Sequence, residues 1–137
     1  MGFIQPCFIR KSTKDLTDKL HRIGNRCGRG FWHSDINTLL LCGNTQYRCL
    51  DDEWGNTESI ISRGYIDCGV NEDLFLAIAA LRDDSDVYQY FLNEKGVFVF
   101  CNQSELKHVI DNSDDWCDYS VSEFHKATVA ELIEHFK

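Results

Sequence analysis

The sequence contains no run of the roughly 18 apolar residues that a membrane-spanning helix requires. It also does not begin with a positively charged segment followed by an apolar one, because Arg10 and Lys11 come after only a short apolar stretch. We therefore expect no membrane partner. We expect the protein to stay in the compartment where it is made, which we predict to be the cytoplasm of a bacterial host cell.

Signatures of the common cofactor and metal sites are also missing. No Gly-Lys-Ser/Thr follows the glycine-rich segment 24–30, and no strand directly precedes it, which excludes a Walker loop and a dinucleotide-binding fingerprint. The seven cysteines include no Cys-x-x-Cys pair of a zinc site. The acidic segment 83–86 lacks the glycine and the final glutamate of a calcium loop. We predict no cofactor and no metal, although a zinc site of scattered cysteines and an Asp-x-Asp metal site at 83–86 remain open alternatives.

The odd number of cysteines and the missing secretion signal argue against a disulfide framework, so we expect reduced and mostly buried thiols. Catalysis by a thiolate would require a base such as His33, His108 or His125 beside it. The sequence favours none of these pairs. We assign no catalytic residue, and we expect the protein to bind a ligand rather than to catalyse a reaction.

Length and composition predict one core. The chain has 137 residues, of which 43% are apolar and 12% aromatic, enough for a single domain over 1–137. We predict an α+β fold in which a mainly antiparallel sheet is flanked by about three helices. Capping residues and apolar spacing place the helices at 13–24, 71–82 and 128–136, with Ser12 or Thr13, Asn71 and Thr128 as their caps. Alternating apolar runs place strands at 3–10, 30–33, 39–42, 46–50, 60–66, 87–92, 97–101 and 121–126.

Charge is divided unevenly along the chain. Residues 1–30 hold seven of the fourteen Lys and Arg and only two acids, a net +5, while residues 31–137 carry −13, which together give −8. Such asymmetry indicates either an anionic ligand or a fold that neutralises itself.

Two segments share one pattern: 8–16 and 124–132 each contain a strand ending in a basic residue, a hydroxyl cap, an acid and a leucine. A helix N-terminus carries about half a positive charge and free N–H groups, so neighbouring basic residues make it a candidate phosphate site. Two such termini lying side by side would clamp a di-anion. In the alternative interpretation, Asp15 and Glu131 already satisfy these termini.

The glycine-rich segment 24–30 is a second candidate, because its glycines permit close backbone approach and its arginines can each donate two hydrogen bonds to a phosphate. The alternative is a surface loop. Four aromatic residues would either stack on a base of the ligand or belong to the core: Trp32, Trp54, Tyr47 and Tyr65. The predicted ligand-binding residues are Arg10, Lys11, Ser12, Thr13, Arg26, Arg29, Lys126 and Thr128.

Three stretches carry a resemblance: 8–13 with Leu16 and Leu20, 74–86 with Gln89 and Phe91, and 125–128 with 131–136. They resemble small uncharacterised proteins of gut Bacteroidales and their phages. The resemblance implies a cytosolic accessory protein of a phage or mobile element, of a kind that often counters host defence by sequestering a signal or blocking an enzyme.

Three classes of function follow. The first is a non-catalytic protein that binds and sequesters a phosphate-bearing small molecule, such as a nucleotide immune messenger. The alternative is an acidic interaction protein that inhibits a host protein or mimics nucleic acid, using Asp111, Asp114, Asp115 and Asp118. The third is an enzyme acting on nucleotides or phosphates. The net charge disfavours duplex DNA as a partner, and a homo-oligomer would help so small a chain enclose a nucleotide.

Overall fold

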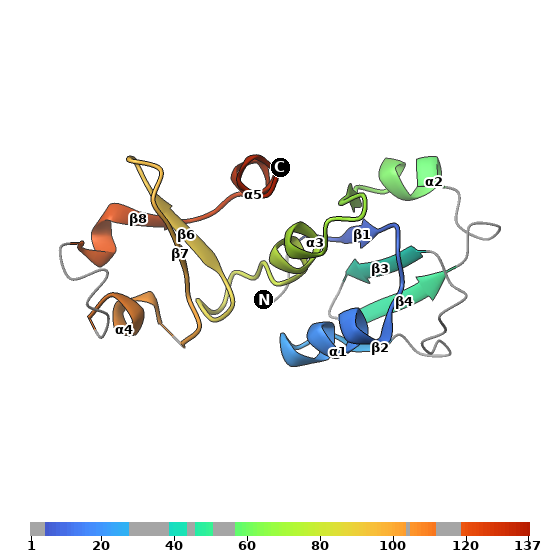
Figure 1. The fold of residues 1–137 in the computed structure, drawn as a ribbon, viewed down its shortest axis with the longest axis horizontal. Coiled ribbons are helices and arrows are strands. Elements are labelled where there is room, and N and C mark those ends of the chain that lie inside the picture. Colours follow the sequence, from blue (N-terminus) through green and yellow to red (C-terminus); the bar gives the residue numbers. More distant parts are fainter. Residues whose placement is uncertain (1–4, 28–38, 44–45, 51–56, 104, 112–118) are drawn as a thin grey trace.

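The computed structural model describes residues 5–27, 39–43, 46–50, 57–103, 105–111 and 119–137. Its described strands form two sheets, with α3 (Glu72–Ala79) and α5 (Val129–His135) between them (Figure 1). The larger sheet has the order β2-β4-β3-β1-β5 and the smaller one β7-β6-β8. The mixed α+β class with mainly antiparallel pairing is confirmed. The strands, however, are divided between two sheets.

Strand β1 (Cys7–Ile9) is an interior strand of the larger sheet and contributes to its core. All three of its residues are fully buried, which explains its continuous apolar sequence. It pairs antiparallel with β3 (Leu39–Gly43) and parallel with β5 (Ile66–Asp67). Strand β4 (Gln46–Leu50) pairs antiparallel with β3 and parallel with the short β2 (Arg26–Cys27) at the edge.

The smaller sheet is built on the predicted hairpin. Strands β6 (Tyr90–Asn93) and β7 (Phe98–Phe100) pair antiparallel around a turn in which the Asn93 side chain accepts from the amides of Lys95 and Val97. Strand β8 (Phe124–Lys126) pairs with the other edge of β6. The hairpin and the final strand are therefore confirmed, the latter shortened by a 3₁₀ turn at Val121–Glu123.

The three predicted helix starts are confirmed. The caps of α1 (Lys14–Arg22), α3 and α5 are Thr13, Asn71 and Thr128, each accepting a hydrogen bond from a backbone amide three residues later. At α5 the Glu131 side chain completes the capping box.

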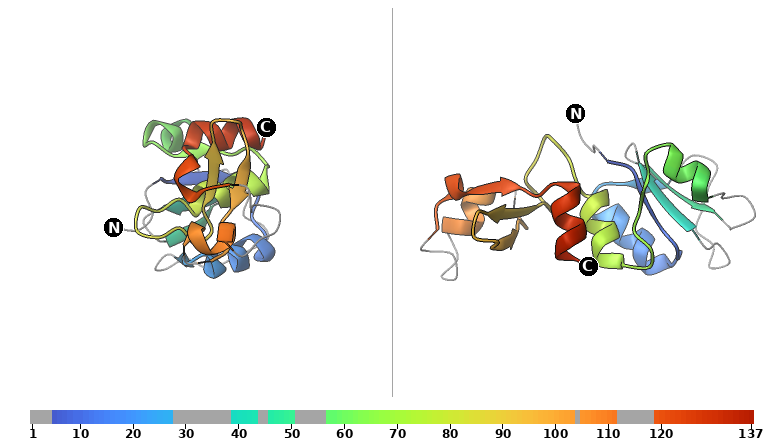
Figure 2. Two further views of the ribbon diagram at one scale, coloured as in Figure 1. Left: turned by 90° about the vertical axis from the view of Figure 1, so that its left-hand side faces the viewer. Right: turned by 90° about the horizontal axis from the view of Figure 1, so that it is seen from above.

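Helix α3 lies at the centre of the molecule, with α5 beside it (Figure 2). Phe75 and Ile78 of α3 are fully buried, and the same core includes Leu132 of α5 and Leu16 of α1. Asn71, at the start of α3, donates from Nδ2 to the carbonyl of Phe136, just past the end of α5, at 2.6 Å. The two helices therefore run antiparallel.

One predicted strand is wrong. The segment 60–66 holds the end of α2 (Thr57–Ser62) and only the first residue of β5. Ile60 is buried and its neighbour Ile61 is 47% exposed, and a turn with Gly64 at φ +92° follows the helix. The apolar run alone did not distinguish a helix end from a strand. A further short helix, α4 (Leu106–Asp111), lies between the predicted strands 97–101 and 121–126, where no helix was predicted.

Five described cysteines, Cys7, Cys42, Cys49, Cys68 and Cys101, are buried free thiols, as predicted. Burial raises the pKa of Cys42 to about 12, so this thiol stays protonated near neutrality. Within the described ranges, no helix combines the length and apolarity needed to cross a membrane. The predicted strand 30–33 and the acidic residues Asp114, Asp115 and Asp118 lie outside the described residues.

Candidate functional site

The first predicted anion site is already neutralised by acids of the same fold. The Arg10 guanidinium pairs with both carboxylate oxygens of Asp67, at 2.7 and 3.3 Å, and the Lys11 ammonium lies 3.2 Å from Glu72. Thr13 caps α1, and the Ser12 side chain is buried. These contacts support the self-neutralising interpretation of the basic segment.

The second predicted site is occupied by backbone groups. Lys126 donates from its ammonium to the carbonyls of Arg82 and Ser85, both at 2.8 Å. Thr128 and Glu131 satisfy the N-terminus of α5, and the Glu131 carboxylate also lies 3.0 Å from the His125 ring. Lys126 therefore joins β8 to the loop that follows α3.

The two helix N-termini are not neighbours. Lys11, before α1, contacts Glu72 at the first residue of α3, whereas Lys126, before α5, contacts Arg82 beyond the last turn of α3. The length of α3, about 12 Å for eight residues, lies between them. The structure therefore does not form the predicted clamp for one small di-anion.

The remaining predicted residues are scattered. Arg26 is exposed on the edge strand β2, while Arg29, Trp32 and Trp54 lie outside the described residues. Tyr47 is only 4% exposed, and its hydroxyl lies 2.6 Å from the ring nitrogen of His21, so it belongs to the core.

A different set of residues forms a cleft. Helix α1, helix α3 and the hairpin β6–β7 border an open cleft of about 270 Å³. Its lining combines apolar, aromatic and charged side chains: Lys19, Arg22, Ile23, Asp73, Leu76, Ala77, Ala80, Tyr88, Tyr90 and Phe100. Clefts with an apolar lining and a few polar groups are typical ligand sites.

Aromatic rings form the hairpin wall of this cleft. The ring centroids of Tyr90 and Phe100 are 5.0 Å apart, and those of Tyr88 and Phe100 are 6.5 Å apart. Phe100 is 43% exposed, unusual for so large an apolar side chain. Burial and the nearby Asp73 carboxylate raise the pKa of Tyr90, so its hydroxyl remains a hydrogen-bond donor at neutral pH. The wall offers exposed ring surface and polar hydroxyls.

Two cations from the last turn of α1 stand on another side. Lys19 pairs with Asp15 at 3.1 Å, one turn earlier. Arg22 is exposed and makes no hydrogen bond or ion pair with another described residue. Both cations belong to the basic segment 1–30, so the uneven charge of the sequence already indicated the part of the chain that supplies them. The hairpin that completes the cleft is some 70 residues away in the chain, and nothing in the sequence connects them.

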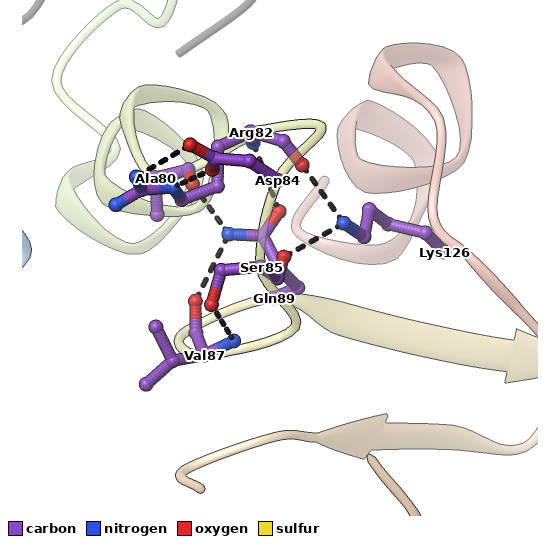
Figure 3. Close-up of polar contacts among 7 residues, drawn as sticks. All are labelled: Ala80, Arg82, Asp84, Ser85, Val87, Gln89 and Lys126. Atoms are coloured by element: carbon purple, nitrogen blue, oxygen red, sulfur yellow. Dashed lines mark hydrogen bonds and ion pairs between the residues drawn. The ribbon is translucent and has the colours of Figure 1, made fainter. Parts of the chain in front are cut away.

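The loop between α3 and β6 is held by the buried side chain of Gln89 (Figure 3). Its amide donates to the carbonyls of Ala80 and Val87, and its Oε1 accepts from the amide of Arg82. Lys126 closes the same loop from β8. The loop is therefore tied to both the helix and the sheet.

This network positions Tyr88 at the cleft with a strained backbone conformation. Tyr88 has φ +64° and is the one non-glycine residue at positive φ in the described part of the chain. Such backbone geometry costs on the order of 1 kcal/mol or more and persists only where its surroundings impose it. Here the Tyr88 amide donates to the carbonyl of Cys101 at 2.7 Å, and Gln89 is locked beside it. Strain of this kind is typical of ligand sites.

The acidic segment 83–86 is engaged within the protein. Asp84 pairs with the Arg82 guanidinium, and Asp86 accepts from the amide of Leu106 at 3.1 Å, at the start of α4. Among the described residues, no group of three or more potential ligand side chains is arranged to hold a metal ion. A second depression, at the β6–β7 turn, is lined by polar residues with two carboxylates and one ammonium, a poor match for an anion: Asn93, Glu94, Lys95, Ser122 and Glu123.

No protein-family model matches the chain, and neither a curated protein nor a solved structure shows significant similarity to it.

The Arg10 ion pair leads to a prediction about acid stability. Hydrogen bonding by Arg10 holds the pKa of Asp67 below its ordinary value of 3.8. Because the pKa is lowered in the folded state, the ion pair stabilises the fold above the ordinary pKa, and this stabilisation is lost as the pH falls through the folded-state value. We expect Asp67→Asn to lower the free energy of unfolding by about 0.5–1 kcal/mol at pH 7, because the pair is partly exposed, and to have little effect at pH 2. Urea unfolding at several pH values measures this, and an equal loss at both pH values would contradict it.

Proposed function

We propose that the protein binds a phosphate-bearing small molecule with a planar base, a nucleotide, in the cleft between α1, α3 and the β6–β7 hairpin. The observation that carries this proposal is that the exposed ring of Phe100, two half-buried tyrosines and two cations meet around one cleft. A base stacked on an aromatic side chain contributes about 1–3 kcal/mol. The Arg22 guanidinium presents paired donors that suit phosphate oxygens.

The proposal changes the location of the predicted site and retains the predicted class of ligand. In the cleft the ligand meets Arg22, which has no described acidic partner, whereas Arg10 and Lys11 already face carboxylates. We further propose that the protein sequesters the nucleotide, which it binds and later releases without chemical change. Such an activity fits a phage or mobile-element accessory protein that removes a host signal, as the resemblance implies.

A thermal-shift screen against cyclic and linear nucleotides tests this function. A ligand at one hundred times its dissociation constant stabilises the folded state by about 2.7 kcal/mol, which raises the melting temperature measurably. We expect a shift with one class of nucleotide, and recovery of that nucleotide with unchanged mass. An altered mass would show an enzyme. No shift with any nucleotide would contradict the proposal and favour the acidic interaction protein, to be tested by salt-sensitive capture of a basic partner.

A further inference from the structure

The charges that line the cleft nearly balance, and this restricts the ligand. Lys19 and Arg22 supply two positive charges, and Asp73 supplies one negative charge. Lys19 is in addition shared with Asp15. Both cations stand in the last turn of α1, where the helix end carries about half a negative charge. The first turn of α3, which carries Asp73, contributes a similar positive partial charge, so the described lining offers a net charge of about +1 to a ligand.

Building on the proposed function, we infer that the ligand is a single nucleotide whose phosphate carries one negative charge, the chemistry of a phosphodiester such as a 3′,5′-cyclic mononucleotide. A single phosphodiester anion matches the net charge of the lining. Each additional phosphate charge would find no further cation among the described residues of the lining and would meet the Asp73 carboxylate instead.

The size of the cleft supports the same class. About 270 Å³ lies just below the roughly 300–1,000 Å³ typical of sites for drug-sized ligands. One base with its sugar and phosphate suits this space, whereas a dinucleotide does not. Asp73, exposed on the first turn of α3, can accept a hydrogen bond from a ribose hydroxyl or from an amino group of the base. This carboxylate therefore limits the charge of the ligand and still offers it a polar contact.

Competition between ligands of different charge tests the inference. The full chain is titrated calorimetrically, at constant ionic strength, with 3′,5′-cyclic AMP, 5′-AMP and ATP, and with the guanosine series. We expect the cyclic monophosphate of one base to bind at least about fivefold more tightly than its 5′-monophosphate, and the triphosphate to bind most weakly. Tightest binding of the triphosphate would overturn the inference and leave the proposed function standing. The absence of binding by every nucleotide would overturn both.

The variant Asp73→Asn removes the opposing charge while it keeps the shape of the side chain. We expect its preference for the cyclic form over the 5′-monophosphate to shrink by about threefold to fivefold. Glu134→Gln, on the exposed face of α5, makes the same change in net charge away from the cleft and should leave the preference unchanged. An identical preference in the wild type and Asp73→Asn, or an equal change in both variants, would overturn the assignment to Asp73.

Discussion

Replacing Arg22 by glutamate is expected to weaken nucleotide binding by a factor of about 10 to 100. A hydrogen bond to a charged group contributes about 1.5–3 kcal/mol, and each 1.4 kcal/mol corresponds to a factor of ten in affinity. The substitution removes a guanidinium that has no described acidic partner and places a carboxylate where the phosphate would bind. Isothermal titration with the best nucleotide of the screen measures the loss.

The folded state should tolerate this change, because exposed charges contribute on the order of a kcal/mol or less. Arg63→Glu is the matched control: Arg63 is also exposed, but it follows α2 and does not line the cleft. Its net charge change is the same, so we expect unchanged affinity. Equal losses in both variants would mean that binding responds only to overall charge, and the cleft would be the wrong site.

Arg10→Glu tests the site predicted from the sequence. Loss of binding in this variant, with Arg22→Glu unaffected, would favour the helix N-terminus beside Arg10 over the cleft. Our account expects the reverse, because Arg10 is already engaged by Asp67 and Lys11 by Glu72.

Replacing Gln89 by leucine is expected to lower the free energy of unfolding by about 3 kcal/mol. The side chain is 1% exposed and makes hydrogen bonds to the carbonyls of Ala80 and Val87 and the amide of Arg82. Leucine has a similar volume but leaves these backbone groups without their partner, and an unsatisfied buried polar group costs about 1–3 kcal/mol. Urea unfolding followed by circular dichroism measures the change.

Gln103→Leu is the control, because Gln103 is exposed and should change stability by less than about 0.5 kcal/mol. We also expect Gln89→Leu to weaken nucleotide binding, because the strained backbone of Tyr88 depends on the neighbouring network. A Gln89→Leu protein as stable as the wild type would show that the network does not hold this loop.

Local signals predicted the local structure well. Asn71 and Thr128 were predicted as helix caps, and the cap of α1 was narrowed to Ser12 or Thr13, because a side-chain hydroxyl or amide oxygen reaches an amide only three residues away. The hairpin around residues 93–97 follows equally from neighbouring residues. The error at 60–66 has a local cause, since Ile60 and Ile61 fit either a helix end or a strand.

The site could not be predicted in the same way. The cleft joins the end of α1 to a hairpin some 70 residues later, and only the packing of α3 between the two sheets brings them together. The sequence also gives no sign of which cations will be paired. Arg10 and Lys11 stand beside caps, yet acids from β5 and α3 neutralise them, and Lys126 serves two backbone carbonyls. The surplus of basic residues was visible, but its distribution in space was not.

The most direct test of the account is a two-dimensional NMR titration of the full chain with the tightest nucleotide of the screen. We predict that the largest amide shifts fall on the end of α1, on α3 and on 88–100, with Arg22 and Tyr88 among them. Shifts concentrated at 10–13 and 126–128, or none at a ligand concentration that saturates the thermal shift, would contradict the assignment of binding to this cleft.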